Sequence, residues 1–354
     1  MCKTRSPMVA TTAFLVMALS IPLPLQADEV SDFYSGRQVR LLIGYTAGGG
    51  YDTYARLLAR HLGKHIPGNP TVVPQNMPGA GSLALANFLY NVAPKDGSVI
   101  GTFARGMAME PLISGEGTQF DASQFSWIGS LNNEVSVCVS WHTSDVKTMQ
   151  DLETKQLIVG GTGSGSDTDI FPTVISNLLH ANIKLISGYP GGNDILLALE
   201  RGEVDGRCGW SWSTVMSRRP EWIEEGRINI LAQIALEKHP DLSHVPLITE
   251  FADSEDELLA MELIFSRQVM GRPYLAPPNV PAERHEALRR AFDATTRDPE
   301  FLADAERLQL ELNPVNGEEI DTLITRIYGA SQSAIELAAN AIIKTDRLNI
   351  NSGR

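Results

Sequence analysis

The sequence lacks the features that mark several large classes of protein. It contains only three cysteines, no Cys-x-x-Cys pair and no block of Lys and Arg, and aromatic residues make up 7% of its 354 residues. Charged residues account for 20% and hydrophobic residues for 43%, which excludes a disordered, collagen-like or coiled-coil protein. A formal net charge of −13 and the lack of a basic face argue against a nucleic-acid partner. We therefore expect an acidic globular protein, long enough for two domains.

The first 27 residues have the layout of a secretory signal. Lys3 and Arg5 precede an apolar stretch from Met8 to Leu25, and the small residue Ala27 follows. The longest uninterrupted apolar run, Ala13 to Leu19, is too short to span a bilayer. We expect cleavage near Ala27 and a soluble protein exported to the periplasm. Cleavage removes two basic and no acidic residues, so the mature chain carries 27 basic against 42 acidic residues, or −15.

The cysteines leave their pairing open. Cys2 lies ahead of the apolar stretch of the signal, a position that does not fit a lipoprotein anchor. Cys138 and Cys208 each lie in an apolar segment, where a small buried residue is expected. The sequence favours two buried thiols over a disulfide, but geometry decides whether they pair.

Short apolar runs alternate with amphipathic helical patterns along the mature chain. In the first part, strands are expected at 39–43, 71–73 and 98–103, and helices at about 54–62 and 82–92. This βαβαβ order predicts a parallel sheet.

A second series of strands and helices follows and predicts a second α/β lobe. Its strands are expected at 135–141, 157–159, 183–186, 207–210 and 228–234, and its helices at 167–179 and 194–201. The remainder is mainly helical and ends in one long helix from about Glu318 to Ile343, which should pack back on the first lobe. The expected organisation is a signal at 1–27, a first lobe of 28–137 plus 245–354, and a second lobe of 138–244.

A glycine run from Gly44 to Asp52 lies between a predicted strand and a predicted helix. Glycines expose backbone N–H groups and a helix start adds partial positive charge, so the segment suits an anion. It lacks the Lys-Ser/Thr pair of a P-loop, and the spacing of Gly48, Gly49 and Gly50 is not a dinucleotide fingerprint. A flexible strand-to-helix turn is the alternative. Asp52 is expected to organise the loop rather than to contact a ligand.

A second glycine run, from Gly160 to Asp167, again lies between a strand and a helix. It adds the hydroxyl groups of Thr162, Ser164 and Ser166 to its backbone donors, which suits a carboxylate or a phosphate. Each run opens a helix in a separate predicted lobe. Together they suggest a ligand clasped between the lobes, at the strand ends where open α/β sheets bind.

Other chemistry-bearing residues have weaker signals. Arg105 follows the strand at 98–103 and could pair with a carboxylate, but a solvated loop arginine fits equally well. His61 and His65 have helical spacing but no evident third metal ligand, so surface histidines are expected. Trp210 and Trp212 alternate in a predicted strand, which suggests core and cleft wall.

Four segments carry a resemblance to a known family. The sequence resembles the Bug-type, or TctC-like, periplasmic solute-binding receptors of tripartite tricarboxylate transporters. The matching segments are Gly48-Gly49-Gly50-Tyr51-Asp52 with Arg56, Gln75 to Ser82 with Ala93 to Gly97, Gly161 to Ser166, and Tyr189 to Gly192 with Arg201 to Asp205.

The resemblance implies a two-lobed periplasmic binding protein of type II, a Venus flytrap, in which each lobe is a mostly parallel sheet flanked by helices. It implies that a carboxylate is held largely by backbone groups of Thr46 to Gly50 and Thr162 to Ser166. Asp205 matches an aspartate that helps to orient the second half of the site. Tyr45 and Tyr51 depart from the usual pattern and, with the tryptophan pair, favour a larger or aromatic acid.

The expected function follows from the loops and the resemblance together. We expect a non-enzymatic, monomeric receptor without cofactor or metal, which passes a di-, tri- or aromatic carboxylate to membrane permease subunits. Two alternatives remain: an exported enzyme that uses Asp52, Asp167 or Asp205, and a protein that presents its ligand to a membrane sensor kinase. The expected ligand-binding residues are Tyr45, Thr46, Ala47, Gly48, Gly49, Gly50, Tyr51, Arg105, Thr162, Gly163, Ser164, Gly165, Ser166 and Asp205.

Overall fold

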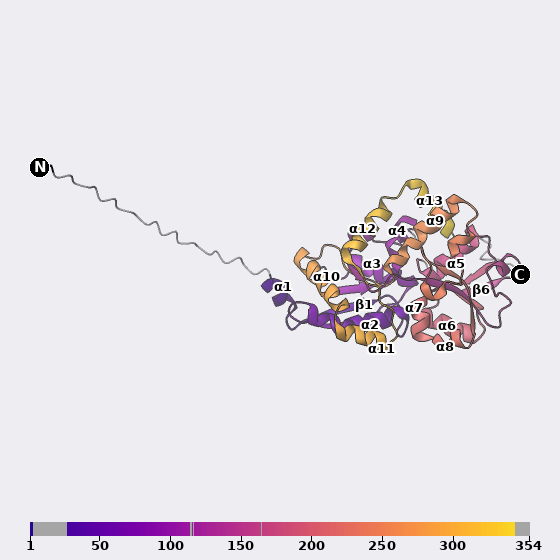
Figure 1. The fold of residues 1–354 in the computed structure, drawn as a ribbon, viewed down its shortest axis with the longest axis horizontal. Helices are drawn as coiled ribbons and strands as arrows, with labels where there is room; N and C mark the ends of the chain where they lie inside the picture. Colours follow the sequence, from indigo (N-terminus) through magenta and orange to yellow (C-terminus); the bar gives the residue numbers. More distant parts are fainter. Residues whose placement is uncertain (3–26, 114, 116, 164, 344–354) are drawn as a thin grey trace.

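The structure is a computed structural model that describes residues 1–2 and 27–343 apart from 114, 116 and 164. Most of the predicted signal, residues 3–26, and the predicted site residue Ser164 lie outside this description. Figure 1 shows two lobes side by side, each with its own sheet. No helix within the described ranges is both long and apolar enough to cross a bilayer.

The first lobe is built on a mixed sheet with strand order β11-β4-β10-β3-β1-β2. β1 pairs in parallel with β2 and β3, whereas β10 is antiparallel to β3 and β4. The strands are β1 (Gln38–Ile43), β2 (Thr71–Asn76), β3 (Val99–Thr102), β4 (Ser126–Ser130), β10 (Pro273–Ala276) and β11 (Val315–Asn316). The helices of this part are α1 (Ala27–Tyr34), α2 (Gly50–Leu62), α3 (Leu83–Asn91), α4 (Glu110–Ile113), α10 (Ala282–Thr296), α11 (Pro299–Arg307) and α12 (Gly317–Tyr328).

The second lobe has a sheet of order β7-β6-β8-β5-β9, in which only β5 runs against its neighbours. Its strands are β5 (Ser136–Trp141), β6 (Leu157–Gly160), β7 (Ile183–Ile186), β8 (Gly206–Ser211) and β9 (Ile228–Ile234). Its helices are α5 (Asp167–Leu178), α6 (Gly192–Glu200), α7 (Trp212–Arg218), α8 (Pro220–Glu224) and α9 (Glu255–Phe265). The predicted fold class, two α/β lobes with helices flanking each sheet, is confirmed.

Hydrophobic spacing explains how the helices attach to the sheets. In α2, Tyr54, Leu57, Leu58 and Leu62 are buried, which places one face of the helix on the core of the first lobe. The opposite face carries the exposed Arg56. The start of the helix is therefore held in a fixed place at the edge of the sheet.

The segment after β9 packs differently from the expectation. Met261, Ile264 and Phe265 of α9 belong to the same buried cluster as Phe171 and Val174 of α5. α9 therefore completes the core of the second lobe, and the chain returns to the first lobe only at β10. The prediction that all of 245–354 belongs to the first lobe does not match this packing.

The predicted long C-terminal helix is wrong, because two helices replace it. α12 ends at Tyr328, and α13 (Gln332–Ile342) begins after Ser331, whose hydroxyl caps it by accepting a hydrogen bond from the Ala334 N–H at 3.3 Å. α13 then lies beside α9 (Figure 1), with Ala338 and Ala341 buried in the core of the second lobe. The hydrophobic pattern continues across the break, so periodicity alone did not reveal it.

Cys138 and Cys208 form a disulfide between β5 and β8. Both residues are fully buried, as expected, but the interpretation as two thiols is wrong. The two strands are antiparallel neighbours, and a bulge in their register brings the cysteines opposite each other. This tertiary pairing was not visible in the sequence.

We predict that the disulfide stabilises the second lobe. It closes a loop with a sequence separation of 70, so replacing both cysteines by alanine should lower the free energy of unfolding by about 2–4 kcal/mol. Urea unfolding of the wild-type protein with and without reductant, beside the double variant, measures this. Reduced wild-type protein should match the variant, and equal stability of all three samples would contradict the prediction.

Candidate ligand-binding site

An enclosed cleft of about 60 Å³ lies between the lobes and is lined by residues of both. The predicted site residues that line it are Tyr45, Thr46, Gly49, Gly50, Tyr51, Arg105, Thr162 and Ser166. The lining residues that the sequence analysis did not assign to the site are Asp167, Thr168, Gly192, Asn193, Leu196, Arg207, Gly209, Trp210, Ser211, Thr214 and Arg272. The two predicted loops therefore meet, and a third segment around α6 joins them.

The starts of α2, α5 and α6 converge on this cleft. Their N-caps are Gly49, Ser166 and Gly191, and none of these residues caps its helix with a side-chain hydrogen bond. The first N–H groups of a helix have no partner within the helix and carry partial positive charge. Three such helix starts around one cleft make it suited to an anion.

An aspartate at the third position of a helix holds each predicted glycine loop in place. The Asp52 carboxylate accepts a hydrogen bond from the Gly48 N–H at 2.8 Å, and the Asp169 carboxylate accepts one from the Gly163 N–H at 2.9 Å. Burial raises the pKa of Asp52, but the hydrogen bonds from Arg56, Gly48 and Asn76 outweigh it and lower that pKa below its usual value. The predicted role of Asp52 as loop organiser is confirmed.

Two stacked tyrosines form one wall of the cleft. The rings of Tyr45 and Tyr51 lie 4.9 Å apart with an interplanar angle of 23°. The Tyr51 hydroxyl accepts a hydrogen bond from the Arg105 N–H at 3.1 Å. Burial raises the pKa of both phenols, so they stay neutral at physiological pH.

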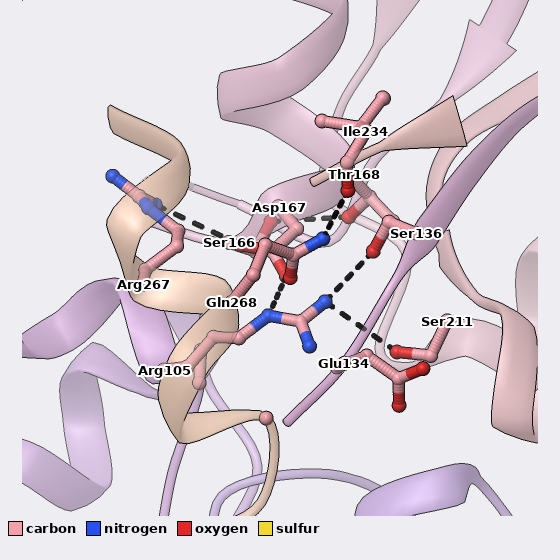
Figure 2. A network of polar contacts seen from close by, with 12 residues as sticks. Arg105, Glu134, Ser136, Ser166, Asp167, Thr168, Ser211, Ile234, Arg267 and Gln268 are labelled. Carbon is pink, nitrogen blue, oxygen red and sulfur yellow. Dashed lines mark hydrogen bonds and ion pairs between the residues drawn. The ribbon is translucent and has the colours of Figure 1, made fainter. Parts of the chain in front are cut away.

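Arg105 connects the two lobes through a network that Figure 2 shows. Its Nε lies 2.5 Å from Oδ2 of Asp167 at the start of α5, and its Nη2 lies 2.8 Å from the Ser136 hydroxyl oxygen. The side chain is 1% exposed, so the alternative of a solvated loop arginine is wrong. Burial lowers the pKa of Arg105, but the Asp167 carboxylate outweighs it and raises that pKa.

Arg272 is neutralised in a similar way at the back of the cleft. Its Nη2 lies 3.1 Å from Oε2 of Glu134, and both side chains are buried. Its guanidinium also lies 4.9 Å from the ring centroids of Tyr51 and Tyr54. The positive charge of Arg272 is therefore compensated within the protein.

Arg207 differs from these two arginines. It is 8% exposed, and its only hydrogen bond to another described residue runs from Nη1 to the Gly192 carbonyl oxygen at 3.1 Å. Within the described ranges it has no ion pair, and its buried Nε has no hydrogen-bond partner. Burial lowers the pKa of Arg207 to about 9. An arginine within an otherwise apolar strand was the sequence signal that could have revealed it.

A bulge in β8 sets the direction of Arg207. Val137 and Val139 of β5 pair with Trp210 and Arg207 of β8, so β8 has one extra residue over this stretch. Both Arg207 and Trp210 then line the cleft. Gly209 within the bulge has φ of 77°, and a Cβ there would lie 2.6 Å from the Asp167 carbonyl oxygen. A glycine is needed at this position because the start of α5 lies directly against the strand. Trp212, expected in the strand, instead begins α7.

Several predicted residues lie outside the cleft lining. Ala47 is exposed, Gly48 supports the first loop, and Gly163 and Gly165 pack against the first lobe at Gly81 and Met107. Their small size permits the lobes to approach each other.

Asp205 is a correction to the predicted site. It lies just before β8 and is not among the residues that line the cleft, to which this strand contributes Arg207, Gly209, Trp210 and Ser211. Its backbone N–H donates to the Ile158 carbonyl at 2.7 Å, which ties the start of β8 to β6. We therefore leave Asp205 out of the candidate site.

His61 of α2 and His65, which lies just after this helix, tie it to α11 and to the residue that caps α11. His61 Nε2 lies 3.0 Å from Asp304, and His65 Nε2 lies 2.8 Å from Asp298. The Lys64 ammonium occupies the same place, 2.6 Å from the Asp298 carboxylate. His61, Asp298 and Glu300 could approach one cation, but this ammonium already neutralises the carboxylate.

Comparison with known proteins supports the resemblance inferred from the sequence. No protein-family model matches the chain. It is 25% identical over 294 residues to a UPF0065 protein of Agrobacterium vitis from the TAR-I ttuE-ttuC′ intergenic region, a match that covers 81% of this chain and 78% of that protein. It is 24% identical over 349 residues to a UPF0065 protein of Cupriavidus necator from the gbd 5′ region, covering 94% and 95% of the two chains.

Solved structures share the fold. The periplasmic binding protein BugD matches with a TM-score of 0.68 and 21% identity, over 85% of this chain and 96% of BugD. MatC from Rhodopseudomonas palustris with bound malate matches with a TM-score of 0.65 and 17% identity, over 86% of this chain and 99% of MatC. Rpa4515 from R. palustris with adipate matches with a TM-score of 0.65 and 19% identity, over 84% of this chain and 97% of Rpa4515. The chain thus has the two-lobed fold of the Bug and TctC periplasmic binding proteins, and the predicted resemblance is confirmed.

We predict that contact between the lobes depends on Gly191. A Cβ at this position would collide with the Thr46 hydroxyl group of the first lobe and would lie 3.4 Å from its Cβ. Gly191→Ala should therefore weaken the contact by about 1–3 kcal/mol and increase the radius of gyration measured by solution scattering.

Removal of the obstructing hydroxyl provides the control. The double variant Gly191→Ala with Thr46→Ala should recover the wild-type radius of gyration and the hydrogen-exchange protection at the start of α6. An unchanged radius in the single variant would show that this contact does not hold the lobes together.

Proposed function

We propose that this chain is a periplasmic receptor that captures a small organic carboxylate and delivers it to the permease of a tripartite tricarboxylate transporter. The observation that carries the proposal is the convergence of three helix starts, without side-chain caps, on one cleft between two lobes. Such helix starts are complementary to an anion and poorly complementary to a neutral or cationic solute.

The donors around the cleft are sufficient for useful affinity. A micromolar dissociation constant corresponds to about −8.2 kcal/mol, and each hydrogen bond to a charged group contributes about 1.5–3 kcal/mol. Donors from both lobes can therefore offset the cost of bringing the lobes together. The cleft lies at the carboxyl ends of β1 and β6, where open α/β sheets bind their ligands.

The comparisons support the same class of ligand and the location. Two structures with this fold hold malate and adipate, which are small carboxylates. Proteins of this fold are described as periplasmic binding proteins, which agrees with the signal layout in the sequence. We extend both properties to this chain as part of the proposal.

The arrangement of the acidic residues favours a receptor over an enzyme. A general acid or base needs a carboxyl group that is free to exchange a proton beside a reacting atom. Asp52 is engaged by Arg56 and the first loop, and Asp167 is paired with Arg105. Asp205 lies just before β8 and does not line the cleft. None of the three is placed as the enzymatic alternative requires.

We predict that binding requires the ionised carboxylate. Calorimetry on refolded protein stripped of copurified ligand should show binding of small organic acids, and the methyl ester or amide of the same acid should bind at least about 100-fold more weakly, because two charge-assisted hydrogen bonds are lost. Mass spectrometry of the acid after denaturation should recover it unchanged. Equal affinity for acid and ester would contradict the proposal, and conversion of the acid would favour the enzyme.

A further inference from the structure

The cleft carries one positive charge that the protein does not compensate. Of the described residues that line it, Arg105, Arg207 and Arg272 are cationic and Asp167 is anionic. Asp167 pairs with Arg105, and Glu134 behind the lining pairs with Arg272. Among the described residues, Arg207 is left as a buried guanidinium without a carboxylate, a state that is unfavourable unless an anion is supplied.

The free groups of Arg207 have the geometry that a carboxylate needs. Nη1 donates to the Gly192 carbonyl oxygen, whereas the buried Nε has no hydrogen-bond partner in the described part of the chain. Nε and Nη2 form one edge of the planar guanidinium, which can donate two parallel hydrogen bonds to a carboxylate. Arg105 Nη1 and Arg272 Nε also lack a hydrogen-bond partner, but those two guanidinium groups already contact carboxylates.

The start of α6 lies directly beside that guanidinium. A Cβ at Gly192 would lie 2.8 Å from Nη2 of Arg207, so only glycine leaves room for the side chain in this position. The arginine and the partial positive charge of the helix start therefore act on the same small volume.

We propose that Arg207 binds the ligand carboxylate directly. This inference rests on the proposed function and names a residue of its binding site. The carboxylate would supply the opposite charge that this buried guanidinium lacks among the described residues.

The test compares Arg207→Gln with wild-type protein by calorimetry, using acetate, lactate, pyruvate, malate and adipate as probes. Arg207→Gln should weaken the binding of the acid that the wild-type protein binds best at least about 100-fold. Arg207→Lys, which keeps the charge but loses the planar edge, should retain part of the affinity. Arg227→Gln, which removes an exposed arginine of the same lobe, is the matched control and should bind like wild type.

Thermal unfolding without ligand separates a binding role from a structural one. Arg207 makes one hydrogen bond, to the Gly192 carbonyl oxygen, and lies 5.2 Å from the centroid of the Trp210 ring, so Arg207→Gln should change the ligand-free melting temperature little. It should abolish the rise caused by the acid that the wild-type protein binds best. A lowered melting temperature with equal weakening of all five acids would show a structural role and overturn the inference.

The remaining outcomes distinguish this inference from the proposed function. Wild-type affinity in Arg207→Gln would overturn the inference and leave the carboxylate receptor intact. Absence of binding to any of the five acids would overturn both.

Discussion

The burial of guanidinium groups between the lobes is the constraint on which the rest of the structure depends. Arg105, Arg267 and Arg272 are each 1% exposed at this junction. A buried charge costs several kcal/mol unless an opposite charge meets it. Asp167 contacts both Arg105 and, at 3.7 Å, Arg267, and Glu134 pairs with Arg272, so each of these guanidinium groups has a carboxylate beside it where the lobes meet.

This constraint links closure of the lobes to binding. The Arg105–Asp167 pair joins the first lobe to the start of α5, so the protein itself supplies part of the attraction across the cleft. In the proposed function, an anion that pairs with Arg207 would bind the closed arrangement better than an open one, and that difference in affinity would drive closure.

Close approach of backbones is the second requirement, and glycines meet it. Gly50 and Gly191 lie where a Cβ would collide with Thr214 and Thr46 of the opposite lobe. The glycines of the cleft thus serve two purposes: they open backbone N–H groups toward an anion, and they let the lobes come together.

The sequence by itself determined the two α/β lobes and the two glycine loops. Strands at 183–186 and 228–234 and the start of a helix at Asp167 were predicted where the structure has them. These features depend on local periodicity and on glycines next to each other in the chain, so they can be recognised without knowing what packs against them.

Only the tertiary structure decided which residues complete the cleft. Arg207 reaches it through a bulge, Arg272 comes from the returning chain, and α6 contributes a helix start that the sequence analysis did not assign to the site. The Cys138–Cys208 disulfide and the return of α13 to the second lobe were equally hidden. Each depends on contacts between segments far apart in sequence, and such contacts are set by sheet register and packing rather than by local pattern.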